Sequence, residues 1–328
     1  MDFSPALHDV KTTVDKELKN FFLKKRDEAR SIHPQTLPLV DEVTDFTLRG
    51  GKRTRPFLVW LGFQAVIARS ESASDVAILK KHEIASPSEL ARNDTLMSAM
   101  MAIELFESFA LIHDDIIDED AVRRRGPTIH EKFKVESLKF KVKNAQHFGE
   151  SMGILAGDLA LVLADELMEK IVRHSGLRAR LAAKRARDDR RVQFKNVFNI
   201  YQKMKEEVIY GQSLDVLAAA GLPSADQATI NAYKTAWYTV IRPLQIGAAI
   251  AGADKKALDV FVLYGLAVGE GYQLRDDFLD GEISDGEFQD QSSALERQAV
   301  QAVGAIQASM SVVSLFTDFA HFALHRQS

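Results

Sequence analysis

The chain has 328 residues, with 46 acidic side chains against 42 basic ones, and it contains no cysteine. The absence of cysteine excludes disulfide bonds, thiolate metal sites and cysteine nucleophiles. The net charge of −4 provides no overall basic field of the kind that draws a protein to nucleic acid or to an anionic membrane. The 18 glycines and 8 prolines are few for a turn-rich β protein, so the composition favours helices.

The N-terminal segment mixes acids with bases and has no apolar core of a secretory signal, so export is not expected. The apolar stretches at 152–163 and 246–253 are short, and we expect no segment of the chain to reach the ~20 apolar residues that span a bilayer. We therefore expect a cytoplasmic protein that does not span a membrane and does not bind nucleic acid.

Apolar residues recur at spacings of three and four between residues 96 and 117, without glycine or proline, which predicts a long helix. Gly126 and Pro127 then predict a loop, because proline has no backbone N–H and restricts the residue before it. Similar helical periods occur at 57–67, 151–172, 192–220, 229–251 and 258–279. No linker or fixed repeat separates two halves, so the sequence predicts a single all-α domain over residues 1–328.

Three carboxylates end the first of these long helices, at Asp114, Asp115 and Asp118. At about 100° per residue, Asp114 and Asp118 share a helix face and Asp115 lies beside them. The three side chains can therefore converge on a hard cation such as Mg²⁺. One such cluster could equally be a helix cap or a solvated helix end.

The same DDxxD spacing returns at Asp276, Asp277 and Asp280, after another long apolar helix. Carboxylates at the ends of apolar helices lose hydration unless a cation balances them, so the repeat favours two metal sites. Mg²⁺ is commonly held by few protein carboxylates and completes its octahedron with waters and substrate phosphates. The two clusters therefore predict a diphosphate ligand.

Basic residues occur in two further segments, GGKRTRP at 50–56 and Arg123-Arg124-Arg125 directly after the first acidic cluster. Paired glycines permit close approach of the backbone, and Lys52 and Arg55 can hold phosphate oxygens. Either segment alone could be ordinary surface.

In these segments the chain resembles the trans-isoprenyl diphosphate synthases of the polyprenyl synthetase family, and among them the geranylgeranyl diphosphate synthases. The resemblance covers roughly residues 40–280, through GGKRTRP, LIHDDIIDEDAVRRRGPTIH, HFGESMGILAGDLAL, EEVIYGQSLDV, YKTAW and YGLAVGEGYQLRDDFLD. It implies a homodimer whose all-α isoprenoid synthase fold has about ten or more helices around a central cavity. The two aspartate clusters would face each other across the mouth of that cavity.

The family's site residues are transferred to this chain by the same resemblance. It implies that the six aspartates bind Mg²⁺, with three ions when substrate is bound. The residues implied to bind the allylic diphosphate are Arg123, Gln212, Lys234, Thr235 and Gln273. Those implied to bind isopentenyl diphosphate are Lys52, Arg55 and Arg124, and those implied to limit product chain length are Phe109 and Ala110.

The activity that the resemblance implies is a magnesium-dependent head-to-tail prenyl transfer. Isopentenyl diphosphate would be condensed with dimethylallyl, geranyl or farnesyl diphosphate to a short-chain trans-prenyl diphosphate, with geranylgeranyl diphosphate the favoured product. One alternative is a non-catalytic or regulatory subunit of a heteromeric synthase, against which the intact aspartate clusters argue. A second alternative is a terpene cyclase on the same scaffold, which would not need the GGKRTRP segment.

Two departures from the family pattern stand out. The family usually carries lysines in a loop after the second aspartate cluster, whereas this chain reads GEISDGEFQDQSSALE. Glu107 occupies a position where the family commonly has His or Gln contacting isopentenyl diphosphate. Both departures remove positively charged or neutral hydrogen-bond donors near the substrate diphosphates. We therefore expect strong magnesium dependence and weak allylic substrate binding.

Overall fold

The computed structural model of the protein describes residues 3–70, 94–179, 184–279, 281–306 and 308–326, apart from the side chains of 68–70 and 172–192. The chain divides into two compact units. The first unit comprises Met1–Ala6, Phe57–Leu96 and Val172–Ser328, and the second comprises Leu7–Pro56 and Met97–Ile171. Both units combine segments that are distant in sequence, and the expected single domain stays a prediction.

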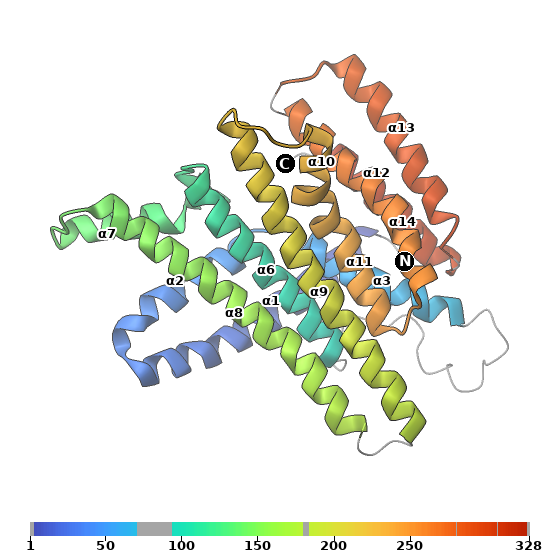
Figure 1. Cartoon of the computed structure of the whole chain (residues 1–328), viewed down its shortest axis with the longest axis horizontal. Coiled ribbons are helices and arrows are strands. Elements are labelled where there is room, and N and C mark those ends of the chain that lie inside the picture. The colour runs from blue at the N-terminus through green and yellow to red at the C-terminus, as the bar shows by residue number, and fades with distance from the viewer. Residues whose placement is uncertain (1–2, 71–93, 180–183, 280, 307, 327–328) are drawn as a thin grey trace. The chain divides into compact units, whose positions relative to one another are not determined.

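The second unit holds most of the N-terminal half of the chain (Figure 1). Its elements include short 3₁₀ and strand segments besides long helices. In whole or large part they are α1 (Phe3–Ile32), η1 (Pro34–Thr36), α2 (Leu37–Leu48), α6 (Asp94–Ile117), β1 (Val122–Arg123), β2 (Gly126–Pro127), α7 (Ile129–Lys139) and α8 (Ala145–Ala179).

All regular elements in the described residues of the first unit are helices. Its elements are α3 (Thr54–Ser70, from Phe57 on), α9 (Lys184–Ala219), α10 (Gln227–Asn231), the π-helical η2 (Ala232–Ile241), α11 (Arg242–Ile250), α12 (Lys255–Leu279), α13 (Asp285–Val303) and α14 (Met310–His325). The all-α prediction is confirmed, because the strands within the described residues amount to one short hairpin.

Helix α6 confirms the helix predicted over residues 96–117. By length and composition alone it could also cross a bilayer, so the expectation that no segment reaches the length of a span was wrong. However, 72% of its most apolar window is buried inside the structure, as in the core helix of a soluble protein. The same helix buries the carboxyl side chains of Glu104 and Glu107.

The segment predicted as one helix over residues 229–251 is divided in the structure. It starts as α10, widens into the π-helical η2 and continues as α11, which has Pro243 in its first turn. Proline cannot donate the N–H that a continuous α-helix needs from that position, and a change of helical hydrogen-bond register accommodates it. This local widening includes Lys234 and Thr235.

The predicted loop at Gly126-Pro127 is a tight antiparallel hairpin. Val122 pairs with Pro127 and Arg123 with Gly126, which leaves Arg124 and Arg125 as the two turn residues. Both have positive φ, 52° and 62°, as a two-residue turn between twisted strands requires. Non-glycine residues adopt this conformation at a cost of roughly 1–2 kcal/mol each. Such a cost indicates that the side chains are held in place by a function or by strong contacts.

In the first unit α12 packs against α13, α14 and η2, and Figure 1 shows α12, α13 and α14 side by side. Buried aromatic rings join them: Phe261 stacks on Phe316, and the Tyr264 hydroxyl donates to the carbonyl of Phe316 over 2.8 Å. These contacts hold the first half of α12 against α14.

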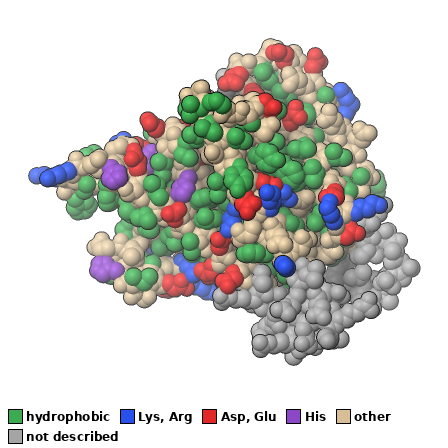
Figure 2. Space-filling view, in the orientation of Figure 1, with side chains coloured by type: hydrophobic (Ala, Val, Ile, Leu, Met, Phe, Trp, Pro, Cys, Tyr) green, Lys and Arg blue, Asp and Glu red, His purple; other side chains and the backbone are tan. Residues whose placement is uncertain are grey.

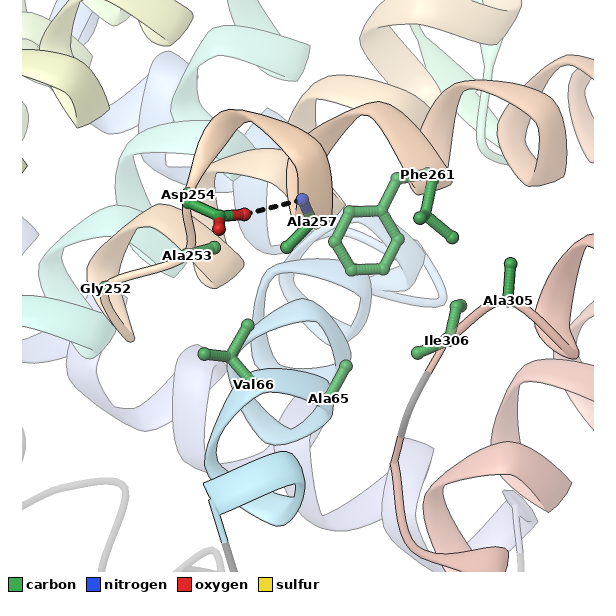
Figure 3. A pocket seen from close by; sticks show the side chains of 10 residues that line it. Ala65, Val66, Gly252, Ala253, Asp254, Ala257, Phe261, Ala305 and Ile306 are labelled. Carbon is green, nitrogen blue, oxygen red and sulfur yellow. Dashed lines mark hydrogen bonds between the residues drawn. The ribbon is translucent and has the colours of Figure 1, made fainter. Parts of the chain in front are cut away.

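An apolar cavity of about 210 Å³ lies in the first unit between the end of α3, the α11–α12 turn and the end of α13 (Figure 3). Small or apolar side chains line it, and Asp254 is the one charged residue among them. Its Oδ1 accepts a hydrogen bond from the Ala257 N–H over 2.8 Å and so caps α12. The cavity contains no expected site residue.

Candidate active site

The glycine-rich loop between α2 and α3 places one arginine in the interior of the second unit. Gly50 and Gly51 have φ of +74° and +75°, and a Cβ on Gly51 would lie 2.6 Å from Arg53 Nη1. Glycine tolerates this left-handed backbone and leaves room for the guanidinium. Arg53 is fully buried, donates to Asp15 over 2.6 Å and to the Thr47 carbonyl over 2.7 Å, and pairs with Glu104.

Two of the arginines expected to bind diphosphate converge on one carboxylate oxygen. Glu107 Oε1 lies 2.9 Å from Arg55 Nη1 and 3.0 Å from Arg124 Nη2. The left-handed turn at Arg124 directs this side chain back across the Phe46 ring, which lies 5.9 Å from the guanidinium. All three charged side chains are less than 20% exposed. The pair forms an anion site that an internal carboxylate occupies.

The pKa values of Glu104 and Glu107 shift in opposite directions in this environment. Burial and the neighbouring Glu107 raise the pKa of Glu104 to about 7, against the opposing effects of Arg53, Arg124 and Arg55. Burial would also raise the pKa of Glu107, but Arg55, Arg124 and Arg53 lower it below its ordinary value. Glu107 is therefore the ionised counter-charge of the arginine pair.

The first aspartate cluster ends α6 in the same unit. Arg123 pairs with the buried Asp115, lies 3.5 Å from Asp114 Oδ2, and donates to Asp120 Oδ2 over 3.2 Å. Arg123 thus binds the cluster's carboxylates directly, whereas Asp118 is exposed at the helix end. Asp114, Asp115 and Arg123 therefore lie together in the second unit.

The donor set of this cluster fits a hard cation. Burial raises the pKa of Asp115 to about 6, although Arg123 lowers it, and Asp120 and Asp114 raise it further. Its Oδ2 is buried and has no hydrogen-bond partner among the described residues. Carboxylate oxygens held close together are the ligands that Mg²⁺ prefers. A Mg²⁺ ion would therefore reduce the repulsion between these carboxylates and provide a partner for Asp115 Oδ2.

The expected chain-length residues lie on α6, one turn before the aspartates. Phe109 is buried, and its ring contacts Phe106 at 5.4 Å and the His113 ring at 4.9 Å between centroids. His113 in turn hydrogen-bonds the Ile154 carbonyl of α8 over 3.2 Å. Phe109 thus packs beside His113, whose hydrogen bond connects α6 to α8. Ala110 is half-buried.

Lys52 is exposed in the glycine-rich loop of the second unit. The first unit holds the other residues expected to bind the allylic diphosphate, together with the second aspartate cluster. Lys234, in the π-helical segment, donates to Asp215 Oδ2 of α9 over 2.6 Å. A Cβ on Gly211 would lie 2.7 Å from the Lys234 backbone N, so glycine allows α9 and η2 to approach this closely. Gln212 and Thr235 are half-buried on the same two elements.

The second aspartate cluster ends α12, and other side chains bind two of its members. Gln273 donates to Asp277 Oδ1 over 2.7 Å, and Arg326 donates to Asp276 Oδ1 over 2.6 Å. Asp280 lies outside the described residues. Gln273 and Asp277 also line a cavity of about 430 Å³ between α10, η2, α12 and α13.

A family model described as "Polyprenyl synthetase" matches residues 37–292 of this chain. The chain belongs to the polyprenyl synthetase family. The match starts just before the glycine-rich loop and ends beyond the second aspartate cluster. It therefore contains every expected site residue of the chain.

Relatives in this family have several different products. A short chain isoprenyl diphosphate synthase of Methanocaldococcus jannaschii is 26% identical over 80% of this chain and 63% of its own length. A geranylgeranyl diphosphate synthase of Methanosarcina mazei is 27% identical over 70% of this chain and 55% of its own length. The chain thus covers less than two thirds of these relatives.

A solved geranylgeranyl pyrophosphate synthase of Corynebacterium glutamicum, complexed with isoprenyl diphosphate and magnesium, has the same fold. It superposes with a TM-score of 0.76 at 23% identity, and the alignment covers 100% of both chains. The isoprenoid synthase fold that the resemblance implied is therefore confirmed.

Several charged residues that lie beside the expected site residues are not predicted from the sequence. Arg53 lies within GGKRTRP but has no predicted role, and its partners Asp15 and Glu104 lie far from it in sequence. Arg326 comes near the C-terminus with no motif around it. The one local signal was at Arg53, which follows two glycines.

The expectation of a loop after the second aspartate cluster is wrong for most of this acidic segment, which is helical from Asp285 on. Helix α13 begins at Asp285, where Ser284 and Glu287 form a reciprocal capping box. Asp285 and Glu287 lie in the first turn, where the helix dipole favours negative charge. These acids therefore stabilise the start of a helix.

Proposed function

We propose that the chain is a magnesium-dependent prenyltransferase that condenses isopentenyl diphosphate head to tail with an allylic diphosphate. One observation supports this most strongly. Arg55 and Arg124 approach a single anionic oxygen within 3.0 Å in the same compact unit as Asp114 and Asp115. Paired guanidinium groups suit a phosphate, and neighbouring carboxylates suit the cation that accompanies it.

The reaction transfers a prenyl group through a carbocation and needs no nucleophile from the protein. The carbon–oxygen bond of the allylic diphosphate breaks and leaves a carbocation and a diphosphate. The isopentenyl double bond attacks that cation, and the released diphosphate accepts the proton lost from the adduct. The groups that matter are therefore those that hold diphosphate and stabilise its added charge.

Residues of this chain fill those roles in two sets. Arg55, Arg124 and Lys52 would bind isopentenyl diphosphate. Arg123, Lys234 and Gln273, with Gln212 and Thr235 beside them, would bind the allylic diphosphate. The six aspartates would hold Mg²⁺, which supplies positive charge to the leaving diphosphate. Three ions are expected with substrate bound.

We further propose that the product is geranylgeranyl diphosphate. An aromatic residue at Phe109, a small one at Ala110 and no insertion in DDIID support a twenty-carbon product. The relatives include geranylgeranyl, farnesyl and geranylfarnesyl diphosphate synthases, so product length is the property that needs measurement.

A homodimer in the cytoplasm is part of the same proposal. Large apolar side chains are exposed on α8 and α9, and the face in Figure 2 has many hydrophobic side chains among interspersed charges. The exposed side chains are Ile154, Leu155 and Val162 on α8 and Ile209, Tyr210 and Val216 on α9. A second copy of the chain would cover such surfaces. Size-exclusion chromatography with light scattering tests the homodimer directly, because it measures the mass of the particle in solution.

The decisive experiment incubates the purified chain with isopentenyl diphosphate, Mg²⁺ and one allylic diphosphate at a time. Chromatography of the dephosphorylated products then gives the chain lengths. Elongation supports the proposal, while release of diphosphate without elongation would indicate a cyclase. Absence of turnover in isolation would indicate a subunit that needs a catalytic partner.

A further inference from the structure

Three side chains of types that can bind a metal ion meet on α13 and α14, and none of them belongs to the site residues described above. His321 and His325 belong to α14, and Glu296 belongs to α13. One candidate ligand atom of each lies within 4.8 Å of the other two. His321 Nδ1 is 3.1 Å from Glu296 Oε1, and His325 Nε2 is 4.0 Å from Glu296 Oε2.

Helical spacing explains why the two imidazoles are neighbours. Residues four apart lie on the same face of an α-helix, one turn above the other. The His321 and His325 rings are accordingly 4.3 Å apart between centroids. The carboxylate of Glu296 comes from a second helix that packs against α14, so the three donors are held by two rigid elements.

The donor set selects a class of cation. Two imidazole nitrogens and one carboxylate oxygen are ligands typical of Zn²⁺ and of its neighbours Co²⁺, Ni²⁺ and Cu²⁺. Mg²⁺ prefers oxygen ligands alone, so it is a poor match for this cluster and a good one for the aspartate clusters. We propose that Glu296, His321 and His325 form a Zn²⁺-class binding site that joins α13 to α14.

The charges around the cluster are compatible with metal binding. Burial, His321 and Arg275 lower the pKa of His325, while Glu296 raises it. A neutral imidazole is the form that coordinates a metal. The repelling Arg275 guanidinium is engaged elsewhere: it lies over the Phe278 and Phe288 rings and donates to the Arg326 carbonyl over 2.7 Å.

The position of the site gives it a structural consequence. His325 directly precedes Arg326, whose guanidinium donates to Asp276 Oδ1 and to the Tyr272 carbonyl. A metal bound to His325 would fix the end of α14 next to this contact. The site would thus hold the C-terminal end against α12, whether or not the proposed prenyl transfer is correct.

Calorimetric titration of ZnCl₂ into the metal-stripped full-length chain tests the proposal, with excess Mg²⁺ present to saturate the aspartate clusters. We expect one Zn²⁺ per chain and a higher melting temperature in its presence. Each of three variants removes one of the proposed ligands, and each should weaken Zn²⁺ binding by at least about tenfold. These variants are Glu296→Gln, His321→Gln and His325→Gln. Bound Co²⁺ should show visible absorption bands that the three variants lack.

His147→Gln is the matched control, since His147 is an exposed histidine on α8 outside the cluster. It should bind Zn²⁺ as the wild type does. Circular dichroism of each variant without metal checks the fold. The proposal is overturned if the wild type takes up no Zn²⁺ in excess Mg²⁺, or if the three cluster variants bind it as tightly as His147→Gln.

Discussion

Arg124 donates a 3.0 Å hydrogen bond to Glu107 Oε1, the same oxygen that lies 2.9 Å from Arg55. In the structure the carboxylate of Glu107 thus occupies the place between two arginines that the family resemblance assigns to a substrate diphosphate. A negatively charged ligand must displace Glu107 or bind against its charge.

Replacing Glu107 with Gln should strengthen binding of inorganic pyrophosphate and isopentenyl diphosphate by about tenfold, equivalent to ~1.4 kcal/mol. The reason is that the arginine pair keeps a polar neighbour but loses its competing charge. The same variant should be less stable by about 1–3 kcal/mol, because two largely buried guanidinium groups lose a counter-ion. Calorimetry measures the first effect and urea unfolding the second.

Asp94→Asn provides the control for Glu107→Gln, because Asp94 is an exposed acid at the other end of α6. It should leave pyrophosphate binding unchanged, and it should lower stability by no more than about 1 kcal/mol, because Asp94 lies in the first turn of α6. Equal or weaker pyrophosphate binding by Glu107→Gln would show that Glu107 is not a competitor for the anion site.

Stability should depend on pH through Glu104, whose pKa is raised to about 7 by burial and by Glu107, against Arg53, Arg124 and Arg55. Between its unfolded pKa of about 4.3 and pH 7 the folded state retains a proton that the unfolded state has lost. The free energy of unfolding contributed by Glu104 therefore falls as pH rises through this window, by at most about 4 kcal/mol.

Urea unfolding of Glu104→Gln and of the wild type from pH 5 to pH 8 measures this contribution. The variant should be relatively more stable at pH 8 than at pH 5, because its amide side chain carries no charge at either pH. A difference between variant and wild type that is constant with pH would rule out titration of Glu104 in this window.

Loss of one carboxylate from either aspartate cluster should abolish most turnover. Asp114→Ala and Asp277→Ala should each reduce kcat by at least about 100-fold, because a ligand of the proposed Mg²⁺ sites disappears. Helical circular dichroism should remain, and melting temperature should stay level or rise as repulsion falls. Asp290→Ala, which removes an exposed acid of α13, should leave the rate unchanged. Near-normal activity in the cluster variants would reject the metal assignment.

Arg326 should raise the concentration of Mg²⁺ that the proposed prenyl transfer needs, because its guanidinium lies 2.6 Å from Asp276 Oδ1. Arg326→Gln should lower the half-saturating Mg²⁺ concentration by about threefold, equivalent to ~0.7 kcal/mol. Steady-state rates over a Mg²⁺ titration measure it, with Arg297→Gln on the exposed side of α13 as control. An unchanged or higher requirement would show that Arg326 does not compete with the cation.

Phe109 should limit product length if it forms the end of the chain-elongation pocket. Phe109→Ala should then lengthen the product by at least one five-carbon unit, because its ring is the large group at that position. Ala110→Phe should shorten the product or leave it unchanged. The same product distribution from Phe109→Ala and wild type would reject the role and leave Phe109 as a packing residue between Phe106 and His113.

The sequence by itself determined the helical class, the long helix α6 and the local contents of both aspartate clusters. These features depend on interactions between near neighbours: apolar periodicity sets which helix face is buried, and the spacing of Asp114, Asp115 and Asp118 sets their common face. The family could be recognised for the same reason, since its motifs are contiguous in sequence.

Only the tertiary structure decided how the charges are paired. Arg53 meets Asp15 across 38 residues and Glu104 across 51 residues, and Arg326 meets Asp276 across 50 residues. Arg55 likewise meets Glu107, which belongs to a different helix. No local pattern encodes such partners, because each pairing depends on how distant helices pack and on which carboxylates become buried. The left-handed turn at Arg124 is decided in the same way, since its conformational cost is balanced by contacts with residues far away in sequence.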